Sequence, residues 1–246
     1  MTSVPESDAW TYDDFTSGEL DPARWIVMAT KGADGQSHPY RDRNARVRTG
    51  DGRLELTVDP FTRFHDSDPR QNNAKQMYRS VRRFPVPAAG QLAFEVDMGV
   101  RTRGQIPYDP VDAFGTVNLF DLDTGVVLNV AATNDTVYAV VERLVLPGVT
   151  GPDDHYMHRV VLDVPTEPGR EHRYAVTYRA ETQEAQWYVD GRLTYWARLP
   201  VPVAAFSAGM GLFSARDLTH YTRAERERGQ GATGWWGPWR IRTSVR

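Results

Sequence analysis

The stretch Trp187-Tyr188-Val189-Asp190-Gly191-Arg192 lies at the centre of a series of hairpin signals. Upstream of it, His172, Tyr174, Val176 and Tyr178 occupy every second position, which is the period of a half-buried strand. Polar residues 181–184 provide a turn, and Asp190-Gly191 suits the positive φ angles of a two-residue hairpin loop. The alternation resumes at 193–195. This segment therefore predicts three consecutive antiparallel strands.

Composition extends this prediction to the whole chain. The 246 residues include 16 Pro, 20 Gly and 11% aromatic residues, which is typical of many short strands separated by turns. All-β sandwiches of this length commonly form one domain. We expect a single all-β domain over residues 1–246, with about twelve to fourteen strands, either as an open sandwich or curled into a flattened β-barrel.

Further strands are predicted throughout the chain, together with one or two short helices. The strands cover residues 46–48, 54–58, 91–101, 113–122, 126–133, 136–146, 155–164, 206–215 and 235–245. Ala74, Met77, Tyr78 and Val81 recur at helical spacing, which favours a short amphipathic helix packed on the sheet. The alternative for this region is a loop over the binding face. Residues 217–228 form the second candidate helix.

Charge and composition exclude several classes of function. A net charge of −3 and a pI near 6.1 give no general attraction for phosphate backbones, so we expect no nucleic-acid partner. No apolar run approaches the ~20 residues that span a bilayer, so we expect no membrane partner. The absence of cysteine excludes disulfides and thiolate chemistry. No nucleotide or dinucleotide fingerprint is present, so we expect no cofactor and a small-molecule substrate.

The N-terminus and the choice of basic residues suggest where the protein works. Residues 1–10 lack the basic and apolar regions of a secretion signal, which predicts a cytoplasmic protein. The chain has 27 Arg and only two Lys, Lys31 and Lys75, as expected of a GC-rich, actinobacterial genome.

Several motifs together resemble the concanavalin-like jelly rolls, the superfamily of legume lectins, laminin-G modules and family 16 glycoside hydrolases. They are H-x-Y-x-V-x-Y followed by W-Y-V-D-G, the D-D-F opening at 13–15, D-x-x-R-W at 21–25, and G-M-G-L-F at 209–213. The resemblance implies an antiparallel two-sheet β-sandwich, with the concave sheet as the usual platform for a ligand. It places Trp25 in the core.

The chain departs from the hydrolases where their chemistry lies. Family 16 enzymes carry an E-x-D-x-x-E strand that supplies two carboxylates for retaining hydrolysis. The strand nearest in order and context has Asn118 and Phe120 at the corresponding positions. The D-x-V-R-V strand beside a structural calcium is replaced by W-R-I-R at 239–242, which argues against that site. His155 and His158 would point to opposite faces of a strand, so we expect no metal site.

Polar residues on the remaining strand faces are the candidate site. We predict catalytic roles for Glu95, Asp97 and Glu142. Arg101, Asn118, Tyr138, Arg143 and Trp187 are the predicted substrate-binding residues. Tyr138 shares a face with Glu142, and an aromatic-walled pocket would raise the pKa of a carboxyl and make it a general acid. The alternative for each of these polar residues is an exposed outer sheet or an internal ion pair.

Three functional hypotheses follow. The first is a cofactor-free cyclase or isomerase of bacterial polyketide and antibiotic biosynthesis, working by general acid/base catalysis such as spiroacetal formation. It rests on the fold type, the inferred source and the missing hydrolase residues. The second is a carbohydrate-binding or glycan-cleaving jelly roll, for which Trp196 or the Trp235-Trp236 pair could provide exposed aromatic rings. The third is a non-catalytic interaction module.

Overall fold

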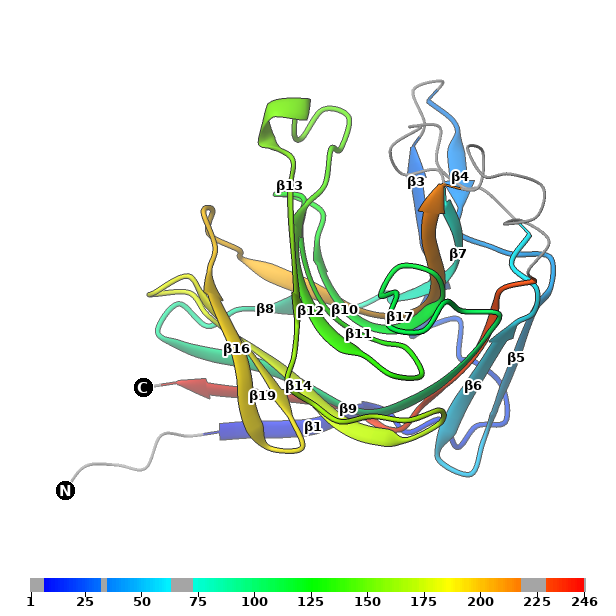
Figure 1. Cartoon of the computed structure of the whole chain (residues 1–246). Coiled ribbons are helices and arrows are strands. Elements are labelled where there is room, and N and C mark those ends of the chain that lie inside the picture. Colours follow the sequence, from blue (N-terminus) through cyan, green and yellow to red (C-terminus); the bar gives the residue numbers. More distant parts are fainter. Residues whose placement is uncertain (1–6, 32–34, 63–72, 218–228, 246) are drawn as a thin grey trace.

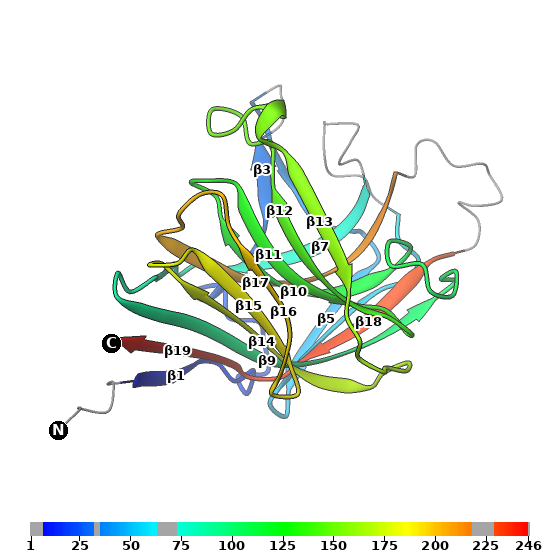
Figure 2. The same cartoon turned by 60° about the vertical axis from the view of Figure 1, so that its left-hand side comes forward.

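The computed structural model describes residues 7–31, 35–62, 73–217 and 229–245. These residues form two large antiparallel β-sheets that face each other across a hydrophobic core (Figures 1 and 2). The only helical element in the described ranges is the single 3-10 turn η1 (Pro152–Asp154). No helix in those ranges is long and apolar enough to cross a membrane.

Sheet A is built around its long strand β9. In order, its main path is β16 (Arg192–Arg198), β15 (Glu184–Val189), β14 (Glu171–Arg179), β9 (Gly90–Arg103), β18 (Gly231–Trp236), β6 (Arg53–Val58) and β5 (Ala45–Gly50). β19 (Trp239–Val245) pairs with the first half of β9, and β1 (Ser7–Asp13) pairs with β19. β18 pairs with the second half of β9, so β9 has β14 along one edge and β19 and then β18 along the other.

Sheet B bends into a trough. Its path is β13 (Tyr156–Val161), β12 (Val137–Arg143), β11 (Val126–Ala132), β10 (Phe114–Asp121), β17 (Ala205–Asp217), β7 (Asn73–Ser80) and β2 (Trp25–Val27), and β8 (Phe84–Pro85) pairs with β17. β12 and β13 stand on one side of the trough, and β7 stands on the other beside the hairpin β3 (Ala29–Lys31) and β4 (Ser37–Pro39) (Figure 1). The face of sheet B turned away from sheet A is therefore concave.

The core lies between the two sheets and follows the period-two pattern of the strands. Leu92, Phe94, Val96, Met98 and Val100 of β9 are all buried in it, as their alternation predicts. The predicted core position of Trp25 is also confirmed. The predicted hairpin series is confirmed as β14, β15 and β16, with Asp190 and Gly191 at positive φ in the tight turn. The described chain is thus an antiparallel jelly-roll sandwich.

The helix predicted from Ala74 to Val81 is wrong, because residues 73–80 form strand β7 of sheet B. Ala74, Lys75, Gln76 and Met77 are consecutive, and all four are buried. The strand is covered on both faces there, so polar and apolar residues do not alternate and a helical spacing arises by coincidence. The Gln76 Oε1 atom accepts a hydrogen bond from the Asp42 backbone N–H at 2.9 Å, which offsets the cost of burying its amide.

Two further predictions need correction at the C-terminal end. The strand predicted over 235–245 is two strands, β18 and β19, separated at Gly237-Pro238. Pro238 has no N–H to donate to a ladder, which explains the break. The flattened barrel is also not formed, because both sheets end in unjoined edge strands, β16 and β5 in one and β13 and β2 in the other, within the described ranges. Of the predicted helix over 217–228, residues 218–228 lie outside the described ranges.

Candidate functional site

A hollow of about 210 Å³ lies on the concave face of sheet B. Its walls come from β7, β10, β11, β12, β13 and β17, with His155 entering from the segment before β13. Strand β12 contributes Tyr138, Val140 and Glu142, because every second residue of the strand faces the trough. Tyr138 and Glu142 therefore both line the hollow, on the common face that their spacing predicts, with Val140 between them.

Aromatic rings form one wall of this concave hollow. The rings of Phe114 and Phe213 stack with centroids 5.4 Å apart and an interplanar angle of 9°. Tyr138 meets Phe114 edge-on, with centroids 5.8 Å apart. The Tyr138 hydroxyl donates a hydrogen bond to the Pro110 carbonyl. Burial raises the pKa of Tyr138 well above its ordinary value, so the phenol stays neutral and keeps this bond.

Glu142 is the carboxylate of the concave hollow, and its side chain is 15% exposed. Its Oε1 atom lies 3.7 Å from His155 Nε2. Burial raises the pKa of Glu142, although the positive charges of Lys75, His155 and Arg159 act in the opposite direction. A carboxyl whose pKa is raised can carry a proton closer to neutral pH and donate it to a ligand oxygen.

Asn129 provides an unused acceptor in the same hollow. It lies opposite Asn118 in the β10–β11 register and opposite Val140 in the β11–β12 register. Its Oδ1 atom is buried and accepts no hydrogen bond from the described residues. Asn118 is engaged differently, since its Nδ2 donates to Thr116 Oγ1 at 2.6 Å. A buried acceptor without a partner costs free energy, which a hydroxyl of a ligand would recover.

Sequence reasoning missed several residues of the concave hollow. They are Lys75, Phe114, Asn129, His155, Arg159 and Phe213. Asn129 could have been found, because it occupies a trough-facing position of a predicted strand and is polar among apolar neighbours. Lys75 was not recognised because a helix was predicted where strand β7 lies. Phe213 was not recognised because an apolar residue in a predicted strand is expected in the core.

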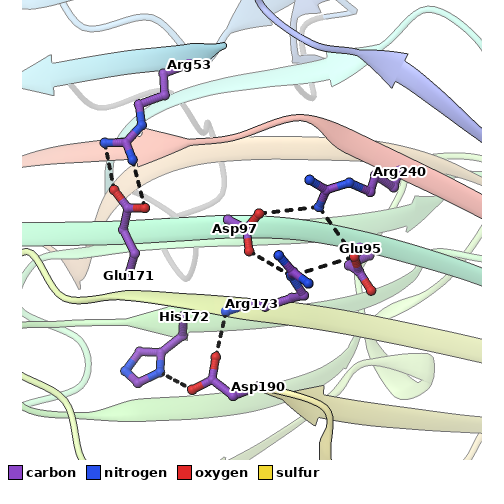
Figure 3. Close-up of polar contacts among 8 residues, drawn as sticks. All are labelled: Arg53, Glu95, Asp97, Glu171, His172, Arg173, Asp190 and Arg240. Atoms are coloured by element: carbon purple, nitrogen blue, oxygen red, sulfur yellow. Dashed lines mark hydrogen bonds and ion pairs between the residues drawn. The ribbon is translucent and has the colours of Figure 1, made fainter. Parts of the chain in front are cut away.

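Glu95 and Asp97 do not join Glu142. They lie on the opposite side of the molecule, on the outer face of sheet A, where Arg173 and Arg240 bridge them (Figure 3). Arg173 Nε donates to Asp97 Oδ1 at 2.9 Å, and Arg240 Nη1 lies 3.3 Å from an oxygen of each carboxylate. The hydrogen bond that Arg173 donates to Asp97 raises the pKa of Arg173. The prediction that Glu95, Asp97 and Glu142 share one pocket is therefore wrong. Alternation along a strand does not show which of the two sheets the strand joins, and β9 and β12 belong to different sheets.

Arg101, Arg143 and Trp187 also lie away from the lining of the concave hollow. Arg101 is exposed on the second half of β9, near Gly169. Arg143 follows Glu142 without a bulge and so points away from it, pairing with Asp154 at 2.9 Å and donating to the Thr124 carbonyl. Trp187 is completely buried in the core. Its indole Nε1 donates to the Asn129 carbonyl at 3.0 Å, so it supports the concave hollow from behind and leaves no surface for a ligand.

Metal ligands are not gathered at this site. No group of three or more His, Asp or Glu side chains in the described ranges is placed to hold a metal ion. His155 contacts Glu142 at the concave hollow, whereas His158 packs beside Tyr156 on the other face of β13.

Solved structures with the same fold include several β-glucanases. The endo-1,3-β-glucanase from Streptomyces sioyaensis has a TM-score of 0.61 and 13% identity, with 100% of both chains covered. The laminarinase catalytic domain from Thermotoga petrophila RKU-1 has a TM-score of 0.61 and 16% identity over 98% of both chains. The Bacillus licheniformis β-glucanase has a TM-score of 0.54 and 15% identity over 100% of both chains.

These identities establish the jelly-roll fold alone. None of the three structures is a polyketide cyclase, so they lend no support to the cyclase hypothesis. No curated protein matches the chain. A family model does match residues 12–245, nearly the full length, under the description "Family of unknown function (DUF6081)". The chain therefore belongs to the family DUF6081.

Proposed function

We propose that this protein binds a carbohydrate in the concave hollow of sheet B. The observation that carries the proposal is the combination of Glu142 with the unpartnered Asn129 Oδ1 beside stacked aromatic rings. Sugars present alternating hydroxyls and apolar ring faces, which match such a mixture of acceptors and aromatic surface. The likeness of the fold to β-glucanases supports the same class of ligand.

The same geometry favours binding over cleavage by two carboxylates. Such cleavage needs a second carboxyl at about 5–5.5 Å for retention or about 6.5–9.5 Å for inversion. Glu142 is the only carboxylate that lines the concave hollow within the described ranges. Its direct neighbours in the register are Val127 and Met157, and the polar position one pair further along is Asn129. We therefore propose that the protein binds a glycan and does not hydrolyse it.

Replacement of Glu142 tests this proposal. We expect Glu142→Gln to weaken binding of the recognised glycan by about tenfold or more, because a hydrogen bond to a charged or proton-sharing group contributes about 1.5–3 kcal/mol. Isothermal titration calorimetry against a panel of β-glucans and other polysaccharides would measure it. Glu167→Gln, in an exposed loop, is the matched control.

Two outcomes of this experiment would contradict the proposal. Failure of the wild-type protein to bind any glycan in the panel would overturn the proposed function. Release of reducing ends by the wild type would show that cleavage occurs and would overturn the proposal of binding alone.

A second candidate function is acid/base catalysis on a small hydroxylated molecule, including the predicted cyclisation of a polyketide. The contact that favours it is Glu142 Oε1 to His155 Nε2 at 3.7 Å, since a carboxyl of raised pKa beside an imidazole can donate and accept protons. Incubation with linear polyketide precursors, followed by mass spectrometry and chiral analysis, tests it. Product formation by the wild type but not by Glu142→Gln is the result that would favour this candidate.

The raised pKa of Glu142 also predicts how stability depends on pH. The folded state holds the Glu142 proton more tightly than the unfolded state, in which the pKa of Glu142 is the ordinary 4.5. The protonated Glu142 therefore contributes its full stabilising free energy below pH 4.5, and this contribution is lost as pH rises through the pKa of the folded state. Relative to Glu142→Gln, the wild type should therefore lose melting temperature between pH 4 and pH 8. Thermal unfolding of both proteins across this range would measure the difference, and a relative gain by the wild type would contradict the assignment.

A further inference from the structure

A second and larger hollow, of about 670 Å³, lies on the outer face of sheet A. It is separated from the concave hollow by the full thickness of the sandwich, and we call it the outer hollow. Its lining comes from β1, β9, β14, β15 and β19 and from the turn between β15 and β16. No part of the proposed function uses it.

Strand register explains why this face is hollowed. Ala93 of β9 lies beside Thr177 of β14, and Ala175 lies beside Glu95. These three short side chains form a low floor at the middle of the sheet. Larger side chains stand on both sides of it, Tyr188 on β15 and Arg242 on β19. A flat sheet face is thereby converted into a depression wide enough for a ring-shaped ligand.

The end of the outer hollow carries the ion-pair cluster of Glu95, Asp97, Arg173 and Arg240 (Figure 3). The Glu95 Oε1 atom contacts both guanidinium groups, whereas no described residue donates to Oε2. Two arginines that each hold two carboxylates fix these side chains in place. The cluster therefore presents a positioned acceptor at the edge of the floor, of the kind that binds a hydroxyl group.

Positive charge exceeds negative charge around the outer hollow. Its charged side chains are Glu95, Asp97, Arg173, Arg240 and Arg242, which leaves one guanidinium in excess. Arg242 is exposed, and it makes no ion pair with any carboxylate in the described part of the chain. A guanidinium binds a carboxylate or sulfate with two parallel hydrogen bonds, so this excess favours an anionic ligand.

Aromatic side chains continue the same face beyond the floor. Tyr188 lines the outer hollow and donates to Gln186 Oε1 at 2.6 Å. Trp196 lies opposite Gln186 in the β15–β16 register and points outward, since its neighbour Tyr195 packs on the buried Trp187. Trp196 is 59% exposed. A large exposed indole beside a polar depression is a surface suited to stacking on a sugar ring.

We propose that the outer hollow binds an anionic glycan, with an acidic sugar held at Arg242 and Glu95 and a neighbouring ring stacked on Tyr188 and Trp196. The occupant is a carbohydrate that carries carboxylates, of the uronic-acid class. This site is distinct from the concave hollow and does not depend on Glu142.

A matched pair of ligands tests this inference. Oligomers of glucuronic acid and of glucose with the same linkage and length would be titrated into the whole protein by calorimetry. We expect the acidic oligomer to bind and its affinity to fall as NaCl rises, because the contact to Arg242 is screened by salt. In a Glu142→Gln background, which impairs the concave hollow, Arg242→Gln and Trp196→Ala should each weaken binding of the acidic oligomer about tenfold or more.

Arg46→Gln is the control, because Arg46 is an exposed arginine on the edge strand β5 at the other end of sheet A. Melting temperatures would show that the variants fold. Wild-type affinity for the acidic oligomer in Arg242→Gln and Trp196→Ala would overturn the outer site while leaving the proposed function intact. Equal affinity for the acidic and the neutral oligomer in the Glu142→Gln variant, whose concave hollow is impaired, would also overturn it. Loss of a wild-type dimer in Trp196→Ala, seen by sedimentation, would instead identify this face as a contact between two copies of the chain.

Discussion

Trp187→Ala should lower the stability of this protein by about 3–5 kcal/mol, the usual cost of removing a large aromatic side chain from a core. Trp187 is completely buried between the two sheets. It packs against Tyr195 at a centroid distance of 5.2 Å, and its indole donates to the Asn129 carbonyl of the opposite sheet. The substitution therefore leaves both a cavity and an unpaired carbonyl. At about 2–4 °C per kcal/mol for a domain of this size, we expect the melting temperature to fall by about 10 °C.

Trp196→Ala is the matched comparison, because the two tryptophans belong to adjoining strands of the same hairpin. The exposed Trp196 should change stability by no more than about 0.5 kcal/mol. Thermal and denaturant unfolding of both variants would measure the contrast. Equal effects on stability would contradict the placement of Trp187 inside and Trp196 outside.

Gly211→Ala should destabilise the protein by about 3 kcal/mol, although it adds a single methyl group. Gly211 lies in β17 between Met77 of β7 and Thr116 of β10. A Cβ atom there would lie 2.6 Å from the Gln76 carbonyl oxygen and 3.1 Å from Met77 Cα. Both obstacles are backbone atoms, so relief requires β17 and β7 to separate, and overpacking of this kind typically costs about 1–3 kcal/mol or more.

Gly151→Ala is the control for Gly211. A Cβ atom at Gly151 would meet only Asp154 Oδ2, at 3.8 Å, and the backbone there is extended. We expect little change in its melting temperature. If Gly211→Ala were as stable as Gly151→Ala, the close approach of β17 and β7 would be incorrect.

The strands with one buried face could be predicted from sequence, and β9 and the 172–195 hairpin series are the best examples. Each has polar residues on one face and apolar residues on the other, so polar and apolar residues alternate along the amino-acid sequence. Strand β7 could not be predicted, because its two faces are both covered and Lys75 and Gln76 are buried. The site was predicted in part. Tyr138 and Glu142 line the concave hollow, and Asn118 lies outside its lining but opposite Asn129 on the same face. Glu95 and Asp97 lie on the far side of the sandwich.

The class of fold, the hairpin at 187–192 and the face of each amphipathic strand could be predicted from the amino-acid sequence, because they depend on residues close together in the chain. The sheet that each strand joins, and therefore which polar faces meet, is known only from the folded structure. Glu95 and Glu142 both lie on predicted strands, yet one faces the outer hollow and the other the concave hollow. Strand pairing brings together residues more than a hundred positions apart, such as Arg240 and Glu95, and local periodicity carries no information about it.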